Sequence, residues 1–211
     1  MRPYYQDELI TLYHGDSREI LASIVFDVVV TDPPYGIEYK QGMASGKKFG
    51  PIVGDESTNL AAWIIEAVHP KPMLVFGSNH FPASLPEPGA WICWDKRCCE
   101  TADNMIGSPF ELAWKNGPDK PGVMYRIQHG GVVNADGYGI KRVHPTQKPI
   151  ALFEKIIVDH FPSGVVFDPF AGSGTTLVAC KQLGRQAVGV EIDAGYCEAA
   201  SVRLRQGALF A

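Results

Sequence analysis

A short run of residues, Thr31-Asp32-Pro33-Pro34-Tyr35-Gly36, combines groups that could activate an amino group for chemistry. An amino group on an aromatic ring is a poor nucleophile, because its lone pair is delocalised into the ring. Two hydrogen-bond acceptors beside its two hydrogens favour a pyramidal nitrogen with an available lone pair. The Asp32 carboxylate can be one acceptor and the Pro33 carbonyl the other, since proline adds no competing N–H and fixes φ.

The rest of this run suits a flat ligand. Tyr35 offers a face on which an extruded base could stack, and Gly36 lets the chain leave close to that ligand. A strand-ending turn is the alternative, because Asp-Pro and Pro-Pro pairs are common turn formers. The run follows Phe26-Asp27-Val28-Val29-Val30, which is typical of a buried strand. A complete run in that place favours the functional interpretation.

A second run, residues 167–176, reads Phe-Asp-Pro-Phe-Ala-Gly-Ser-Gly-Thr-Thr and predicts a strand, a glycine turn and a helix start. Its two glycines remove side chains where backbone must approach a ligand. Ser173, Thr175 or Thr176 could cap the helix, and the N–H groups at the helix start would suit a carboxylate.

An acid follows this turn at a useful spacing. Glu191 ends the next predicted strand about 20 residues later, where an acid fits ribose hydroxyls, although an exposed strand-end acid is the default interpretation of such a residue taken alone. A dinucleotide-binding turn is the competing interpretation of the glycines. It requires Gly-x-Gly-x-x-Gly, and Leu177 stands in place of the third glycine.

The two runs resemble two motifs of DNA amino-methyltransferases. Asp32-Pro33-Pro34-Tyr35 resembles motif IV, and residues 168–175 resemble motif I, the S-adenosyl-L-methionine turn. In that family the Asp form of motif IV is usual for adenine N6, and a Ser form is common for cytosine N4. The catalytic run precedes the cofactor run, as in the permuted β class, so the resemblance covers nearly the whole chain.

Two shorter runs also resemble family motifs. Residues 144–149, His-Pro-Thr-Gln-Lys-Pro, resemble motif X, which helps to enclose the methionine part of the cofactor; Lys148 could meet its carboxylate. Asp16, after Tyr13-His14-Gly15, resembles motif III and could accept from the cofactor's adenine amino group. Taken alone, the first is an ordinary proline-bounded loop and the second a turn aspartate.

The resemblance therefore implies a catalytic site and a cofactor site by residue. The catalytic residues are Asp32, Pro33, Pro34 and Tyr35. The cofactor residues are Asp16, Asp32, His144, Thr146, Gln147, Lys148, Asp168, Phe170, Ala171, Gly172, Ser173, Gly174, Thr175, Thr176, Glu191 and Ile192.

Alternating apolar and helix-like stretches predict the elements that carry these runs. Strands are expected at 9–13, 26–31, 73–77, 90–94, 110–114, 164–168 and 186–190, and helices at 17–23, 59–69, 150–160, 173–183 and 194–205. Thr58 or Asn59 could cap the second helix. Residues 37–58 are expected to form a loop, and 115–149 to be mostly irregular. With the resemblance, this predicts an α/β, Rossmann-like methyltransferase fold: a twisted, mostly parallel seven-stranded sheet with helices on both faces.

The length of 211 residues fits a single methyltransferase domain, 1–211, with 115–143 as a small target-recognition segment. The net charge of -4 gives no global basic signature. A local excess of +4 lies between Lys115 and Lys148, although a solvated loop of mixed charge is as good an interpretation. This segment and Lys40, Lys47 and Lys48 are expected to hold phosphates of double-stranded DNA, with the target base flipped.

Other classes of function are less well supported. The five cysteines, Cys93, Cys98, Cys99, Cys180 and Cys197, lack zinc-ligand spacing, so no metal is expected. Trp91, Trp94, Asp95 and Lys96 could line the target pocket, but core packing is the simpler account of the tryptophans. No apolar run could span a bilayer, and the N-terminus lacks a signal-peptide core.

These features and the resemblance predict a cytoplasmic, nucleoid-associated enzyme, bacterial or phage-encoded, of restriction–modification type; the family also allows a homodimer. Four alternatives remain. They are cytosine-N4 methylation, an RNA substrate, a non-catalytic DNA- or cofactor-binding module, and a nicotinamide-dependent oxidoreductase.

Overall fold

The computed structural model describes residues 2–36, 53–97, 108–117, 122–130, 133–134 and 147–206. The strands are β1 (Tyr5–Gln6), β2 (Ile10–His14), β3 (Val28–Thr31), β4 (Met73–Phe76), β5 (Gly89–Asp95), β6 (Phe110–Asn116), β7 (Gly122–Arg126), β8 (His129–Gly130), β9 (Val133–Asn134), β10 (Val166–Asp168) and β11 (Ala187–Glu191). The helices are α1 (Ser17–Ile20), α2 (Asn59–Val68), α3 (Ile150–His160), α4 (Thr175–Gln182) and α5 (Ala194–Gln206), with short 3-10 helices at Leu21–Ser23, Ser78–His80 and Pro82–Ser84.

In this part of the chain one sheet of nine strands has the order β1-β2-β11-β10-β3-β4-β6-β5-β7. The central strands from β2 to β4 are parallel, while β1, β6 and β5 each pair antiparallel with a neighbour. The predicted α/β fold with a mostly parallel sheet is confirmed. The prediction of seven strands was too low, because β1 and β7 add at the two edges.

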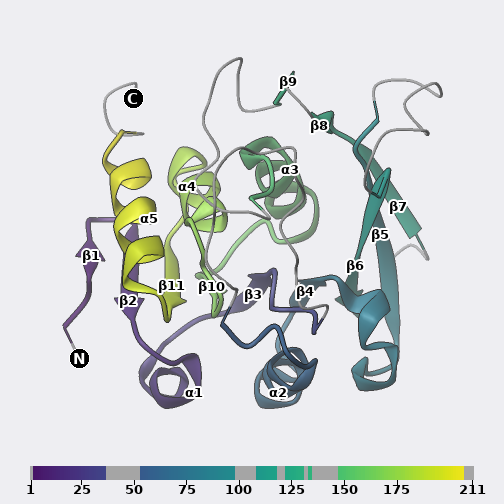
Figure 1. Cartoon of the computed structure of the whole chain (residues 1–211), viewed down its shortest axis with the longest axis horizontal. Coiled ribbons are helices and arrows are strands. Elements are labelled where there is room, and N and C mark those ends of the chain that lie inside the picture. The colour runs from purple at the N-terminus through teal and green to yellow at the C-terminus, as the bar shows by residue number, and fades with distance from the viewer. Residues whose placement is uncertain are drawn as a thin grey trace.

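Helices cover both faces of the sheet, as predicted (Figure 1). Apolar residues of α3, α4 and α5 pack on one face, and those of α1 and α2 pack on the other. The central strands are buried on both sides; all four residues of β3 and of β4 are buried. This double burial explains why these strands read as continuous apolar runs without alternation.

Residues 115–149 contain more strand structure than expected among the residues that the structure describes. β6 continues to Asn116, and residues 122–126 form β7, which pairs parallel with β5. β7 carries Val123, Met124 and Tyr125 among its five residues. Glycines and charges nearby hid this short apolar strand in the sequence, while the free edge of β5 supplied its backbone partners.

The caps predicted for two helices were wrong. Thr58 precedes α2 but makes no side-chain capping hydrogen bond. Gly174 takes the cap position of α4 in the left-handed region, also without a side-chain bond. Ser173 and Thr175 instead accept hydrogen bonds from a side chain of α5, and Thr176 donates one to Asp168.

The two chemistry-bearing runs end neighbouring strands. β3 and β10 pair in parallel, with Val28 opposite Val166 and Val29 opposite Phe167. The carboxyl ends of parallel neighbours lie at the same edge of a sheet, which is where ligands bind in open α/β folds. The predicted catalytic and cofactor runs therefore face a common space.

The two ends of the described chain also meet. Tyr4 donates a hydrogen bond from its hydroxyl to Glu198 of α5 over 3.0 Å, and Figure 1 shows α5 beside β1 and β2. Neighbouring termini are what a circularly permuted order requires. Among the described helices, none is both long and apolar enough to cross a membrane.

Candidate active site

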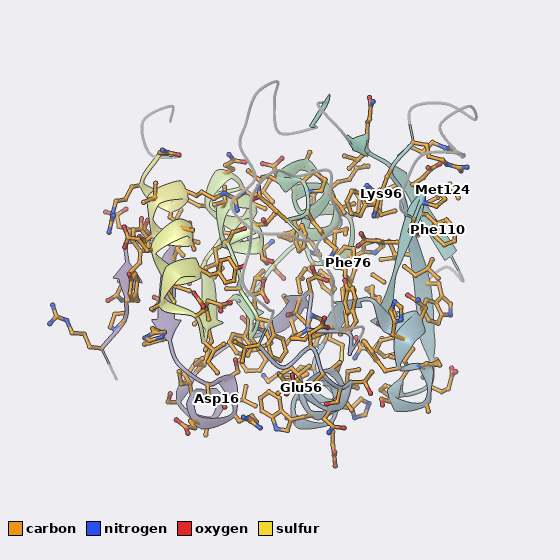
Figure 2. All side chains as sticks on the ribbon, viewed as in Figure 1. Asp16, Glu56, Phe76, Lys96, Phe110 and Met124 are labelled. Carbon is orange, nitrogen blue, oxygen red and sulfur yellow. The ribbon has the colours of Figure 1, made fainter. Side chains whose placement is uncertain are left out.

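A cavity of about 510 Å³ lies at the carboxyl edge of the sheet. Both runs line it: Asp32, Pro33, Pro34 and Tyr35 from the first, and Asp168 to Ser173, Thr175 and Thr176 from the second. Asp16, Gln147, Lys148, Glu191 and Ile192 also line it. Figure 2 labels Asp16 beside α1 and a further lining residue, Glu56, beside α2.

Asp32 has a hydrogen-bond donor at each oxygen. The Tyr35 hydroxyl donates to Oδ1, and the Lys148 ammonium donates to Oδ2. Lys148 Nζ also lies 3.0 Å from the Tyr35 hydroxyl. Motif X and the catalytic turn, 116 residues apart in sequence, are therefore in direct contact.

Burial and charge compete at this cluster. Burial raises the pKa of Asp32, an effect that Lys148 opposes and the nearby Glu111 carboxylate reinforces. Burial alone would lower the pKa of Lys148, but Asp32 and Glu111 raise it, so the group is an ammonium at neutral pH. Burial also raises the pKa of Tyr35 well above its usual value, and its hydroxyl stays protonated.

Asp55 holds the catalytic turn in place and was not predicted. Its Oδ1 accepts from the backbone N–H groups of Tyr35 and Gly36, each over 3.0 Å, and the side chain is buried. Gly36 has φ of 72°, and an added Cβ would lie 2.7 Å from the Ser57 carbonyl carbon. Gly36 is therefore required where the chain leaves the turn.

The Tyr35 ring is packed on its neighbours. His80 stacks on it with centroids 5.4 Å apart and planes at 12°. Gly77, at the end of β4, has φ of 69°, and an added Cβ would lie 2.0 Å from Tyr35 Cε1. These contacts come from the segment that follows β4, and they fix the ring's orientation; no signal in the sequence pointed to them.

The carboxylate of Glu191 supports the glycine turn through backbone hydrogen bonds. Gly172 has φ of 52° and donates its N–H to Glu191 Oε2 over 2.7 Å, while Asp193 donates its N–H to Oε1 over 2.8 Å. Burial raises the pKa of Glu191, and these backbone donors oppose the rise. Glu191 thus both lines the cavity and supports the turn.

Asp168 ties the two runs together. Thr31 of β3 donates its hydroxyl to Oδ1 over 2.7 Å, and Thr176 donates to Oδ2 over 2.5 Å. The N–H of Phe170 also donates to Oδ1. Burial raises the pKa of Asp168 to about 6 despite these donors. The residue joins β3, β10 and α4 at the site.

Of the remaining predicted cofactor residues, some line the cavity, one does not, and others lie outside the described residues. Asp16 caps α1 and pairs with Arg18 at 2.5 Å while lining the cavity. Gly174 does not line the cavity, because it lies against Ala200 of α5, where a Cβ would approach to 2.9 Å. His144 and Thr146 lie outside the described residues, as do Lys40, Lys47 and Lys48.

Residues considered for the target pocket lie away from the cavity. Trp94 is in the core at 1% exposure, as the packing interpretation predicted, and Trp91 is 37% exposed. Asp95 pairs with Arg97 at 2.7 Å. None of these lines the cavity, and neither does Lys96, which pairs with Glu111.

Arg203 of α5 braces the glycine turn and was also missed. Its Nη1 lies 2.7 Å from the Ser173 carbonyl, 3.0 Å from Ser173 Oγ and 3.1 Å from Thr175 Oγ1. Because the turn lines the cavity, we expect Arg203→Ala to weaken cofactor binding about tenfold, as loss of a hydrogen-bonding charge does. Calorimetric titration with S-adenosylmethionine measures this.

Arg205→Ala is the matched control for Arg203→Ala. Arg205 lies two residues further along α5, its side chain is 60% exposed, and it forms a 3.9 Å ion pair with Glu198. Equal cofactor affinity in the two variants would contradict a bracing role for Arg203.

The cavity suits a nucleoside cofactor that carries an amino acid. Carboxylates of Asp16 and Glu191 line one part of it, where hydroxyl and amino donors could bind, and Gln147 and Lys148 line another. Phe170 and Ile192 add apolar surface. The pairing of nucleoside-binding acids with a glycine turn at a helix start matches what such a ligand needs.

A mostly parallel sheet with this site at its carboxyl edge defines a class, the S-adenosylmethionine-dependent DNA methyltransferase fold. The DNA methylase family of N6 and N4 enzymes matches residues 94–202, more than half of the chain. The chain therefore belongs to that family, and S-adenosyl-L-methionine is its cofactor.

Similarities to individual methyltransferases support this assignment. The chain is 28% identical to the type II methyltransferase M.ScaI of Streptomyces caespitosus, over 96% of this chain and 84% of that protein. It is similar to the M1.HpyAVI–SAM complex, with TM-score 0.59 and 26% identity, over 93% of this chain and 99% of that one. The cytosine-N4-specific PvuII DNA methyltransferase shares the fold, with TM-score 0.62, 17% identity and coverage of 96% and 88%.

Proposed function

We propose that this DNA methyltransferase transfers the methyl group of S-adenosylmethionine to N6 of adenine in double-stranded DNA. The observation that carries the proposal is the contact between the two runs: Thr31 at the end of β3 donates to Asp168 at the end of β10, and Asp32 and Asp168 line one cavity. The Asp form of the catalytic turn favours adenine over cytosine.

The catalytic turn would activate the base by hydrogen bonding. The flipped adenine would lie against Tyr35, which lines the cavity and whose ring orientation the stacked His80 helps to fix. Its amino group would donate to Asp32 and to the Pro33 carbonyl, and its lone pair would then point towards the cofactor. Asp55 keeps this turn rigid, so that positioning and electrostatics supply most of the acceleration.

The cofactor, when bound, supplies an electrophilic methyl group on a sulfonium. Glu191 would accept from the ribose hydroxyls and Asp16 from the adenine amino group. The turn from Phe170 to Gly172, with Ser173, Thr175 and Thr176, would enclose the middle of the ligand. Lys148 pairs with Asp32 in the structure, and Gln147 lies beside it on the cavity wall, so the carboxylate of the cofactor would approach both.

The remaining assignments extend this proposal. Residues 1–211 would act as one methyltransferase domain, with 115–143 recognising the target and a homodimer allowed. The likeness to a type II methyltransferase supports a role in a restriction–modification system.

Nucleoside analysis of DNA methylated in vitro tests the base. We expect N6-methyladenine as the product, and N4-methylcytosine would overturn the adenine assignment. Competition with RNA should leave the transfer to DNA unaffected. If the purified protein bound DNA and cofactor yet transferred no labelled methyl group, a non-catalytic binding module would replace the proposal.

A further inference from the structure

Four charged side chains alternate in sign between the far strands of the sheet and the catalytic turn. Lys96 Nζ lies 2.5 Å from Glu111 Oε1, and Glu111 Oε2 lies 3.3 Å from Lys148 Nζ, which donates to Asp32. Figure 2 labels Lys96 at the end of β5. The row therefore connects β5 and β6 to the reacting groups.

The topology of the sheet brings Glu111 to this place. β6 runs antiparallel to β4, so the start of β6 lies at the carboxyl edge where β3 and β4 end. A hydrogen bond of 2.8 Å from Gly77 N–H to the Leu112 carbonyl holds the two strands together there. Glu111 thus lies near the catalytic turn although it is 79 residues from Asp32 in sequence.

The contact between Lys148 and Asp32 opposes the chemistry that Asp32 would perform. During methyl transfer, positive charge develops on the amino nitrogen that donates to Asp32. An ammonium on the same carboxylate repels that charge and competes for its oxygen. Lys148 must therefore give up Asp32 Oδ2, at least in part, when the base enters.

Glu111 offers the ammonium a second position. Its Oε2 is buried and forms a 3.3 Å ion pair with Lys148 but no hydrogen bond, whereas Lys96 pairs with Oε1. A buried carboxylate oxygen without a hydrogen bond costs free energy, and bringing the Lys148 ammonium from this ion pair into hydrogen-bond geometry would remove that cost. The lysine side chain is flexible enough to make this small move.

We propose that Glu111 is a positioning residue for methyl transfer: it accepts the Lys148 ammonium when the base amino group takes its place at Asp32. The move transfers no proton, because Lys148 stays an ammonium throughout. The proposal rests on the methyltransferase function proposed above, and it adds a residue of β6 to the machinery that controls the nucleophile.

Glu111→Gln removes the charge that would attract Lys148. At saturating cofactor and DNA, we expect kcat to fall about 30-fold, since hydrogen bonds to charged groups have effects of that size. We expect KM for the cofactor to change less than about twofold. Glu111→Asp, which keeps the charge on a shorter arm, should recover part of the rate. Rapid-quench measurement of labelled methyl transfer gives these values.

A second variant separates positioning from simple structural support. In Glu111→Gln, kcat falls because the Lys148 ammonium stays on Asp32. Adding Lys148→Met removes that ammonium and should raise kcat about tenfold above the single variant at saturating cofactor. Disruption of the fold would instead make the double variant worse. Glu66→Gln, on the exposed face of α2, is the control and should keep the wild-type kcat.

The outcomes are distinguishable. A wild-type protein without methyl transfer overturns both proposals. If the wild type is active, two results would overturn the Glu111 proposal alone: a Glu111→Gln variant with kcat within about twofold of the wild type, or a double variant no faster than Glu111→Gln.

Discussion

Asp32→Asn is expected to lower kcat for methyl transfer about 1,000-fold while cofactor affinity stays within about threefold. The amide keeps the shape of the side chain, but it places an NH₂ donor where an acceptor is required and removes the charge that stabilises the developing positive nitrogen. Single-turnover transfer from labelled cofactor measures the chemical step, and calorimetry measures the affinity.

The fold should survive the Asp32→Asn substitution. Lys148 keeps Glu111 as a partner at 3.3 Å, so the change leaves no isolated buried charge. Tyr35→Phe is the graded comparison. It removes the hydroxyl that donates to Asp32 but keeps the ring, so a loss of only about tenfold is expected. An Asp32→Asn protein as active as Tyr35→Phe would contradict the acceptor role.

Gly77→Ala is expected to lower kcat about 100-fold, although Gly77 does not line the cavity. The added Cβ would lie 2.0 Å from Tyr35 Cε1, so the ring must move away from its place on His80 and from Asp32. The positive φ of 69° adds backbone strain of about 1 kcal/mol. Methyl-transfer kinetics and thermal unfolding together measure both effects.

Gly184→Ala is the matched control for Gly77→Ala. Gly184 has nearly the same backbone conformation, with φ of 66°, but an added Cβ meets nothing within 4 Å. Both variants should lose stability through strain, and only Gly77→Ala should lose most of its activity. Equal kcat in the two would show that the ring contact with Gly77 does not position Tyr35.

The central elements could be predicted from the sequence because they are buried in a simple way. β3 and β4 are covered on both faces, so each is an uninterrupted apolar run of the kind that only a buried strand tolerates. β1 and β7 lie at the edges, where two or five residues with mixed exposure leave no comparable pattern. The cap predicted for α4 was wrong because the hydroxyls near Gly174 bond to other side chains, Thr176 to Asp168 and Thr175 to Arg203.

The sequence by itself determined the chemistry that each local run can perform: acceptors and an aromatic ring in residues 32–35, and a glycine turn in residues 168–176 followed by Glu191. These properties depend on neighbouring residues alone, because proline and glycine set the local backbone conformation and the side chains supply the functional groups. The order of the two runs also favours the permuted β-class arrangement, which stays a prediction.

Only the tertiary structure decided which distant residues act on those runs. Gly77, Glu111 and Arg203 reach the site through strand pairing and helix packing, and Asp55 reaches it from the turn before α2; each is an ordinary residue in its own segment. The contact of Lys148, a predicted cofactor residue, with Asp32 was likewise visible only in the tertiary structure. The physical reason is that charge and packing act over a few ångströms in space. Those distances depend on the order of strands in the sheet, which no local sequence pattern predicts.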